Sequence, residues 1–129
     1  MKIKKIWANL AVSDLNRTTN FYTQLGFKSN GRSSDLTSFF VSDDNFIIHF
    51  FLKEKLEPSM GGPIADLKNG NEIIFSLSCE SRNEIDQWVK IVTDAGGKIF
   101  SAPSEVGKGY TFGFSDPDGH KFNFLYWPA

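Results

Sequence analysis

Polar side chains that could bind a ligand occur inside otherwise apolar, strand-like stretches. His49 lies within Phe46–Lys53, and Asn123 lies within Lys121–Trp127. Imidazole can donate or accept hydrogen bonds, exchange protons or bind a metal. Asparagine is disfavoured in strands, so Asn9 and Asn123 indicate hydrogen bonding to a ligand or to each other.

Three roles fit His49: a buried histidine bonded to a neighbour, a polar contact in a pocket, or a metal ligand. Glu72 follows Asn69-Gly70-Asn71, a turn-like sequence, so it is either a surface carboxylate at a strand start or a site residue. If Glu72 faces His49, an ion pair between them would raise the pKa of the histidine.

Aromatic residues could form the walls of such a site. Trp7 and Trp127 either pack structurally or form a floor under a planar ligand. Tyr110 follows the flexible Gly107-Lys108-Gly109, so it is a lid residue or a strand-start aromatic. Four other reactive side chains are expected to have no chemical role: two turn-forming aspartates, a solvated histidine and an inert buried thiol, namely Asp116, Asp118, His120 and Cys79.

The first half of the chain reads as strand, helix and three strands. Alternation from about Ile3 to Val12 predicts a strand. Asp14 or Ser13 offers an N-cap to a helix that ends near Gly26. An extended stretch begins at Phe27, and two strands are predicted at 36–42 and 46–53, separated by the turn Ser42-Asp43-Asp44-Asn45.

The second half repeats this order. A strand is predicted at 72–80, then a helix that begins with the capping-box pattern Ser81-Arg82-Asn83-Glu84 and ends at Gly96-Gly97. Three strands follow at 98–102, 109–115 and 121–127, the last two joined by the turn Asp116-Pro117-Asp118-Gly119. We interpret Glu54–Gly70, with its prolines and glycines, as a connector that has room for a short helical turn.

The two predicted helices indicate which face of each sheet is buried. Each helix has an apolar stripe that must be buried against the apolar face of its sheet. The covered faces are predicted to carry Ile6, Ala8, Leu10 and Val12 in the first half and Ile73, Phe75, Leu77 and Cys79 in the second. The opposite faces mix aromatic and polar residues, a composition that suits a ligand pocket better than a dry core. Those residues are Trp7, Asn9, His49, Phe51, Glu72, Ile74, Ser76, Asn123, Leu125 and Trp127.

Composition excludes several classes of function. The 129 residues suit one domain, and the net charge of −1 comes from mixed charges without a basic stripe, which argues against nucleic-acid or membrane-surface binding. The longest apolar run, Phe46–Leu52, is too short to cross a bilayer as a helix. A single cysteine cannot form an internal disulfide, so a cytoplasmic location is expected.

Two segments carry a family resemblance. Ala11-Val12-Ser13-Asp14-Leu15, with Phe21-Tyr22 and Leu25-Gly26-Phe27, resembles the first half of glyoxalase/bleomycin-resistance/dioxygenase proteins, the vicinal oxygen chelate superfamily. Phe114–His120 resembles that family's closing hairpin. The resemblance implies an α+β fold of two βαβββ modules, residues 1–53 and 72–129 joined by a connector at 54–71. Together these modules form a curved mixed sheet around a cavity in a single domain, usually within a homodimer.

The resemblance also indicates where metal-dependent members of the family place their ligands. The corresponding positions are Trp7 and Glu72 on the first strands and His49 and Asn123 on the last strands. Tryptophan cannot bind a divalent metal and asparagine is a weak ligand, whereas a catalytic site needs about three protein ligands. We therefore expect no metal cofactor.

The leading hypothesis is a small-molecule-binding protein that holds a partly aromatic ligand without a metal, as drug-sequestering members of the family do. The predicted ligand-binding residues are Trp7, Asn9, His49, Phe51, Glu72, Ser76, Tyr110, Asn123 and Trp127. An alternative is a metal-dependent lyase or isomerase that uses His49 and Glu72 with Zn, Ni or Fe. A weaker alternative is an interaction or regulatory module with a vestigial pocket.

Overall fold

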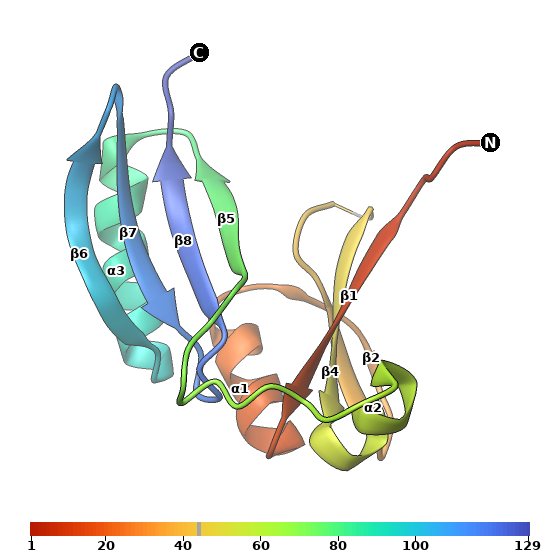
Figure 1. The fold of residues 1–129 in the computed structure, drawn as a ribbon. Coiled ribbons are helices and arrows are strands. Elements are labelled where there is room, and N and C mark those ends of the chain that lie inside the picture. Colours follow the sequence, from red (N-terminus) through yellow and green to blue (C-terminus); the bar gives the residue numbers. More distant parts are fainter. Residues whose placement is uncertain (44) are drawn as a thin grey trace. The chain divides into compact units, whose positions relative to one another are not determined.

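A computed structural model of the chain describes residues 1–43 and 45–129. It forms two compact units, Met1–Ala65 (unit 1) and Asp66–Ala129 (unit 2). Each unit contains a four-stranded mixed sheet and a helix packed on one face of it (Figure 1). The predicted α+β class and the βαβββ order of each module are confirmed. The cavity that the two modules would enclose stays a prediction.

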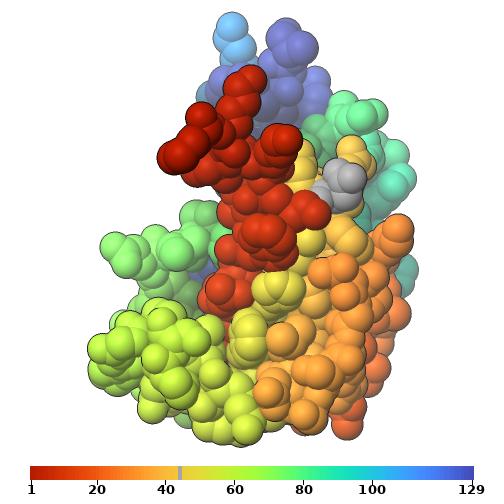
Figure 2. All heavy atoms as spheres, turned by 90° about the vertical axis from the view of Figure 1, so that its right-hand side faces the viewer, coloured from red at the N-terminus to blue at the C-terminus, as the bar shows by residue number. Residues whose placement is uncertain are grey.

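Unit 1 builds its sheet in the order β1-β4-β3-β2. Parallel pairing joins β1 to β4, and the other pairs are antiparallel. In Figure 2, the β1 segment (red) lies at the surface beside the β4 segment (yellow). The strands are β1 (Ile6–Val12), β2 (Lys28–Arg32), β3 (Leu36–Phe40) and β4 (Phe46–Leu52).

Helix α1 (Leu15–Gln24) begins as predicted, with the Asp14 carboxylate accepting a hydrogen bond from the Arg17 N–H. Its buried face packs on the sheet through Tyr22, whose ring stacks on Phe50 at 4.4 Å between centroids. Phe39 of β3 lies in the same aromatic cluster. The core of unit 1 is therefore aromatic, and it lies between α1 and one face of the sheet.

The connector contains more regular structure than the sequence predicts. Helix α2 (Lys53–Met60) is eight residues long, whereas only a short helical turn was expected. It forms because Leu56 is buried and because Pro58 lies in the last turn, where it does not prevent the helix from starting. Gly61 then ends the helix in the left-handed conformation, with φ 67°.

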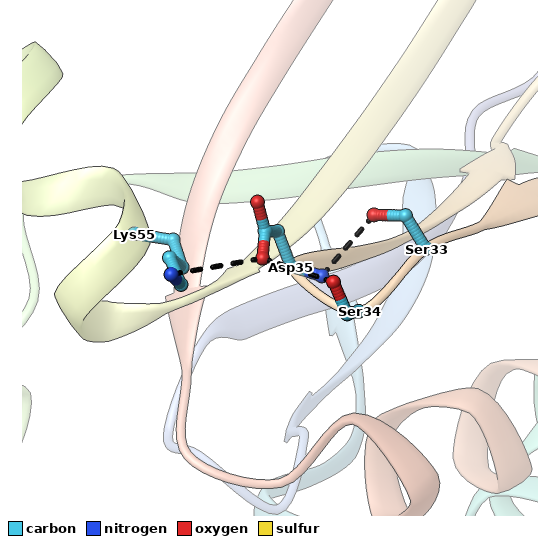
Figure 3. A network of polar contacts seen from close by, with 4 residues as sticks. All are labelled: Ser33, Ser34, Asp35 and Lys55. Atoms are coloured by element: carbon cyan, nitrogen blue, oxygen red, sulfur yellow. Dashed lines mark hydrogen bonds and ion pairs between the residues drawn. The ribbon is translucent and has the colours of Figure 1, made fainter.

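A polar network ties α2 to the β2–β3 turn (Figure 3). The Lys55 ammonium lies 3.9 Å from the Asp35 carboxylate. That carboxylate also accepts a hydrogen bond from the Ser34 hydroxyl, and the Asp35 N–H donates to the Ser33 hydroxyl oxygen. These groups are exposed or half-buried, so their ion pair contributes little to the stability of the unit.

Unit 2 repeats the topology with the order β5-β8-β7-β6, again with one parallel pair, β5 with β8. The elements are β5 (Ile74–Cys79), α3 (Arg82–Ala95), β6 (Lys98–Val106), β7 (Gly109–Ser115) and β8 (Lys121–Tyr126). Helix α3 packs on the sheet through Trp88, whose ring stacks on Phe124 at 4.2 Å between centroids.

The predicted capping box of α3 is present in a modified form. The Ser81 hydroxyl accepts from the Glu84 N–H, as expected, while the Glu84 carboxylate accepts from the Glu80 N–H. The predicted Asp116–Gly119 turn is confirmed, since the Gly119 N–H donates to the Asp116 carbonyl. The predicted turn at Ser42–Asn45 includes Asp44, which lies outside the described residues.

Three details of the prediction are wrong. Ile73 is 59% exposed and not on the covered face, because β5 begins only at Ile74. His120 is buried, not solvated, and its backbone N–H donates a hydrogen bond to the Asp116 carboxylate within the turn. The strand predicted at 98–102 continues to Val106.

Candidate functional site

The strand register defines a second face in each sheet, opposite α1 or α3, which we call the site face. In unit 1, β4 places Ile48 and Phe50 toward α1, so His49 and Phe51 point to the site face. Trp7 and Asn9 of β1 pair with Ile47 and His49 and share that face. The predicted division of β1 and β4 into two faces is confirmed by this register.

A polar row crosses the site face of unit 1. Asn9, His49 and Ser38 are paired neighbours on β1, β4 and β3. The row continues to β2, where the Asn30 amide donates to the Ser38 hydroxyl oxygen at 3.2 Å. Side chains from four strands therefore place hydrogen-bonding groups in one line.

Apolar residues flank this row on both sides. Trp7, Ile47 and Phe40 form one flank, and Ala11, Phe51 and Leu36 form the other. The Phe51 ring meets the His49 ring edge-on, with 6.0 Å between centroids. A polar strip between apolar strips matches a site that orients a partly apolar ligand with a few hydrogen bonds.

The His49 imidazole has an unsatisfied buried atom, because its Nδ1 has no hydrogen-bond partner. Burial lowers the pKa of His49 below its usual value. The ring is therefore neutral at pH 7, and one ring nitrogen can accept a hydrogen bond while the other donates.

Unit 2 carries the corresponding row on its site face. Ser76, Asn123 and Gly113 are paired neighbours on β5, β8 and β7. Asn123 holds the place in this sheet that His49 holds in the other, at the centre of the row on the last strand of its module. The Asn123 Oδ1 atom is also buried without a hydrogen-bond partner. Within residues 1–43 and 45–129, it and His49 Nδ1 are the two such side-chain atoms.

Trp127 follows β8 and packs over the β6–β7 turn. Its ring lies so close to Gly107 and Gly109 that a Cβ on either residue would contact it. Half of the Trp127 side chain remains exposed, as does half of Trp7. Both tryptophans thus present partly exposed rings, which suits either of the two roles expected for them.

Tyr110 is not brought together with the other predicted site residues. It pairs with Tyr126, on the face of the sheet that α3 covers. Its hydroxyl donates to the Asp86 carboxylate of α3 at 3.1 Å, and the Arg82 guanidinium lies 5.5 Å from its ring. Burial and the bond to Asp86 raise the pKa of Tyr110.

Glu72 is exposed and precedes β5, so it is not a member of the polar row of unit 2. Cys79 is buried on the α3 side, and burial, with a contribution from Glu84, raises the pKa of its thiol to about 11. A thiol with that pKa stays protonated at neutral pH and is a poor nucleophile. This agrees with the inert role predicted for it.

Several residues in or near the two polar rows are not predicted from the sequence. Ser38, Asn30 and Thr111 take part in hydrogen bonds of the two rows. Lys121 lies two residues before Asn123 on β8, and its ammonium lies 4.7 Å from the centroid of the Phe100 ring. The alternation in β3, β7 and β8 could have placed Ser38, Thr111 and Lys121 on the site face. It could not have shown which of them pair across strands.

The donor set does not fit a catalytic metal. Of the four positions suggested by the resemblance, Trp7 has no lone pair to offer and Asn123 offers one amide oxygen. Glu72 precedes its strand, which leaves His49 as the one strong ligand on a site face. Among the residues that the structure describes, no group of three or more His, Cys, Asp and Glu side chains is placed to hold a metal ion.

Comparison with known families decides the relationship. A family model described as Glyoxalase/Bleomycin resistance protein/Dioxygenase superfamily matches residues 6–124. The chain belongs to this superfamily. The match spans both βαβββ modules, so the predicted family is confirmed.

Solved structures similar to this superfamily member differ in how their function is described. Hypothetical protein SA1046 from S. aureus is 29% identical, with a TM-score of 0.85 over 98% of this chain and 96% of that chain. A glyoxalase-related enzyme from Fulvimarina pelagi is 18% identical, with a TM-score of 0.85 over 95% and 86%. Lactoylglutathione lyase from Agrobacterium tumefaciens is 16% identical, with a TM-score of 0.71 over 94% and 91%.

The last two similarities establish a shared fold and no activity. No curated protein matches the chain. None of the described helices has the length and hydropathy that crossing a membrane requires.

Proposed function

We propose that this superfamily member binds a small, partly aromatic molecule on its site faces without a catalytic metal. One observation carries the proposal: His49 Nδ1 and Asn123 Oδ1 occupy corresponding positions in the two modules, and both are buried without a hydrogen-bond partner. A buried polar group left unpaired costs about 1–3 kcal/mol. A ligand that pairs with either atom removes that cost, which favours binding.

The surroundings of these two atoms support a partly aromatic ligand. The edge-on contact between Phe51 and His49 leaves an aromatic wall beside the polar row. The exposed rings of Trp7 and Trp127 add apolar surface that water solvates poorly. Aromatic walls supply binding energy, and the few polar groups fix the orientation of the ligand.

The donor set of the site faces does not suit a catalytic metal. One imidazole and one amide oxygen provide too few strong ligands for a site that normally uses three. The metal-dependent lyase alternative would need Glu72 as a second strong ligand, and Glu72 is exposed and precedes β5.

Thermal-shift measurements on protein treated with EDTA test the proposal. A panel of aromatic and heteroaromatic compounds is expected to contain ligands that raise the melting temperature, since binding at 100 times Kd adds about 2.7 kcal/mol of stability. His49→Ala and Asn123→Ala should reduce this shift. Asn83→Ala, which removes an exposed amide from α3, is the matched control and should not reduce it.

A different result would reverse the proposal. If no compound stabilises the metal-free protein while Zn, Ni or Fe(II) binds stoichiometrically and depends on His49, the metal-dependent lyase alternative takes its place.

The homodimer and the cytoplasmic location belong to the same proposal. Light scattering is expected to give roughly twice the 14.5 kDa mass of the chain. Cell fractionation should recover the protein with the cytoplasmic proteins. A monomer mass, or recovery with membranes, would contradict these two points.

A further inference from the structure

The amide of Asn123 is held in one orientation by a chain of hydrogen bonds. The Thr111 hydroxyl donates to the Phe124 carbonyl at 2.7 Å, which uses its single proton. The Thr111 oxygen must therefore accept from the Asn123 amide nitrogen, 3.1 Å away. This leaves Asn123 Oδ1 as a fixed acceptor that only a hydrogen-bond donor can satisfy.

Because of a β-bulge, an aromatic ring lies over Gly113, the register partner of Asn123 on β7. Ile99 pairs with Phe114 and Ser101 pairs with Gly113, so Phe100 is an extra residue in β6. Bulges re-aim side chains, and here the ring lies over Gly113, the neighbour of Asn123 in the polar row. A Cβ on Gly113 would lie 2.5 Å from the Phe100 ring, so glycine leaves the space that the ring occupies. The Phe100 side chain is 41% exposed and can therefore contact a ligand.

A positive charge lies near the Phe100 ring on the same face of the sheet. Lys121 is two residues before Asn123 on β8, so the two side chains share the site face. The Lys121 ammonium lies 4.7 Å from the centroid of the Phe100 ring. The acceptor and the cation of β8 therefore share the site face of unit 2 with the aromatic ring that β6 places over β7.

We propose that Asn123, Phe100 and Lys121 form a subsite for a planar ring that carries an N–H or O–H donor next to an anionic group. The donor would bind Asn123 Oδ1, the ring would stack beside Phe100, and the anion would lie near the Lys121 ammonium. Thr111 is the positioning residue, because it prevents the amide from turning its NH2 group to the ligand. This inference rests on the proposed function and names the ligand class for unit 2.

Three probes separate the contributions in calorimetric titrations of the metal-free protein. Indole-2-carboxylate has the ring, the donor and the anion. Its N-methyl derivative lacks the donor, and indole lacks the anion. The N-methyl derivative should bind about tenfold more weakly or worse, because the Oδ1 acceptor would face a methyl group. Indole should bind up to about fivefold more weakly, as expected for an accessible charge pair.

Variants assign these effects to residues. Thr111→Val removes the bond that orients the amide and should abolish the preference for indole-2-carboxylate over its N-methyl derivative, while Thr111→Ser should restore it. Lys121→Gln should weaken the binding of indole-2-carboxylate by up to about fivefold and reduce its advantage over indole, which lacks the anion. Lys90→Gln is the charge-matched control, since this exposed lysine lies on α3 and pairs with Asp94.

The inference is overturned if both indole carboxylates bind equally, or if Thr111→Val keeps the preference between them. It is also overturned if none of the three probes binds at millimolar concentration while other aromatic compounds stabilise the protein. In that case the proposed function stands without this subsite. If no aromatic compound of any kind binds, the proposed function fails together with it.

Discussion

Gly109 provides a sharp test of how closely the chain packs around Trp127. A Cβ at this position would lie 2.4 Å from the Tyr126 carbonyl oxygen and 2.7 Å from the Trp127 ring. The first obstacle is backbone inside a paired strand, so it cannot swing away as a side chain can. Gly109→Ala therefore forces β7 and β8 apart at the start of their ladder.

The expected magnitude is the difference between two effects. Alanine restricts the unfolded chain more than glycine does, which alone would stabilise the fold by about 0.5–1 kcal/mol. Overpacking a close contact costs about 1–3 kcal/mol. We expect a net loss of about 1–2 kcal/mol in the free energy of unfolding, measured by urea denaturation followed by circular dichroism.

Gly113→Ala is the matched control, since the three atoms nearest to its Cβ all belong to the Phe100 ring, the first of them 2.5 Å away. That ring is partly exposed and can rotate, so Gly113→Ala should be less destabilising than Gly109→Ala. In a Phe100→Ala background the obstacle is gone, and Gly113→Ala should stabilise by about 0.5–1 kcal/mol. The reasoning is refuted if Gly109→Ala is as stable as the parent protein, or if it is tolerated better than Gly113→Ala.

Three further outcomes follow from the structure. Burial lowers the pKa of His49, so below about pH 6.5 the unfolded chain binds a proton that the folded chain does not. The free energy of unfolding should therefore fall as the pH drops below that value, and His49→Gln should flatten this dependence in urea titrations between pH 5 and 8. Cys79, buried and with a thiol pKa of about 11, should react with a disulfide reagent at pH 8 only after unfolding. Ser81→Ala should cost about 1 kcal/mol, because it removes the N-cap of α3, while Ser78→Ala on an exposed strand position should cost little.

Each of these three expectations would be contradicted by a specific result. The same pH dependence in wild type and His49→Gln would show that burial of this ring does not perturb its proton binding. Rapid thiol reaction in the folded protein would contradict the placement of Cys79 under α3. Equal stability of the two serine variants would contradict the role of Ser81 as a cap.

The fold follows from the sequence to a large extent because its signals are local. The alternation in β1 assigns Trp7 and Asn9 to one face, since successive side chains of a strand point to opposite sides. Asp14 and Ser81 mark the helix starts because their side chains satisfy backbone N–H groups there. Helix α2 was underestimated because Pro58 reads as a breaker, although the burial of Leu56 stabilises the helix around it.

The site depends on non-local facts that no spacing reveals. His49 and Ser38 become neighbours through the register of β3 with β4, and Asn123 meets Thr111 through the register of β7 with β8. Phe100 reaches the site face because one extra residue shifts the register of β6. Tyr110 is predicted to contact the ligand, but the register of β7 with β8 places it on the face of the sheet that α3 covers. There its hydroxyl donates a hydrogen bond to the Asp86 carboxylate.

We propose that the two unsatisfied atoms, His49 Nδ1 and Asn123 Oδ1, contact a ligand without a metal. The most direct test is a nitrogen-15 NMR titration of EDTA-treated protein with an aromatic compound that raises its melting temperature. We predict saturable shifts of the His49 ring nitrogens and of the Asn123 side-chain amide, with the amide signals of α1 and α3 unchanged. Signals of these two residues that stay fixed with the compound and move only when Zn, Ni or Fe(II) is added would contradict the account.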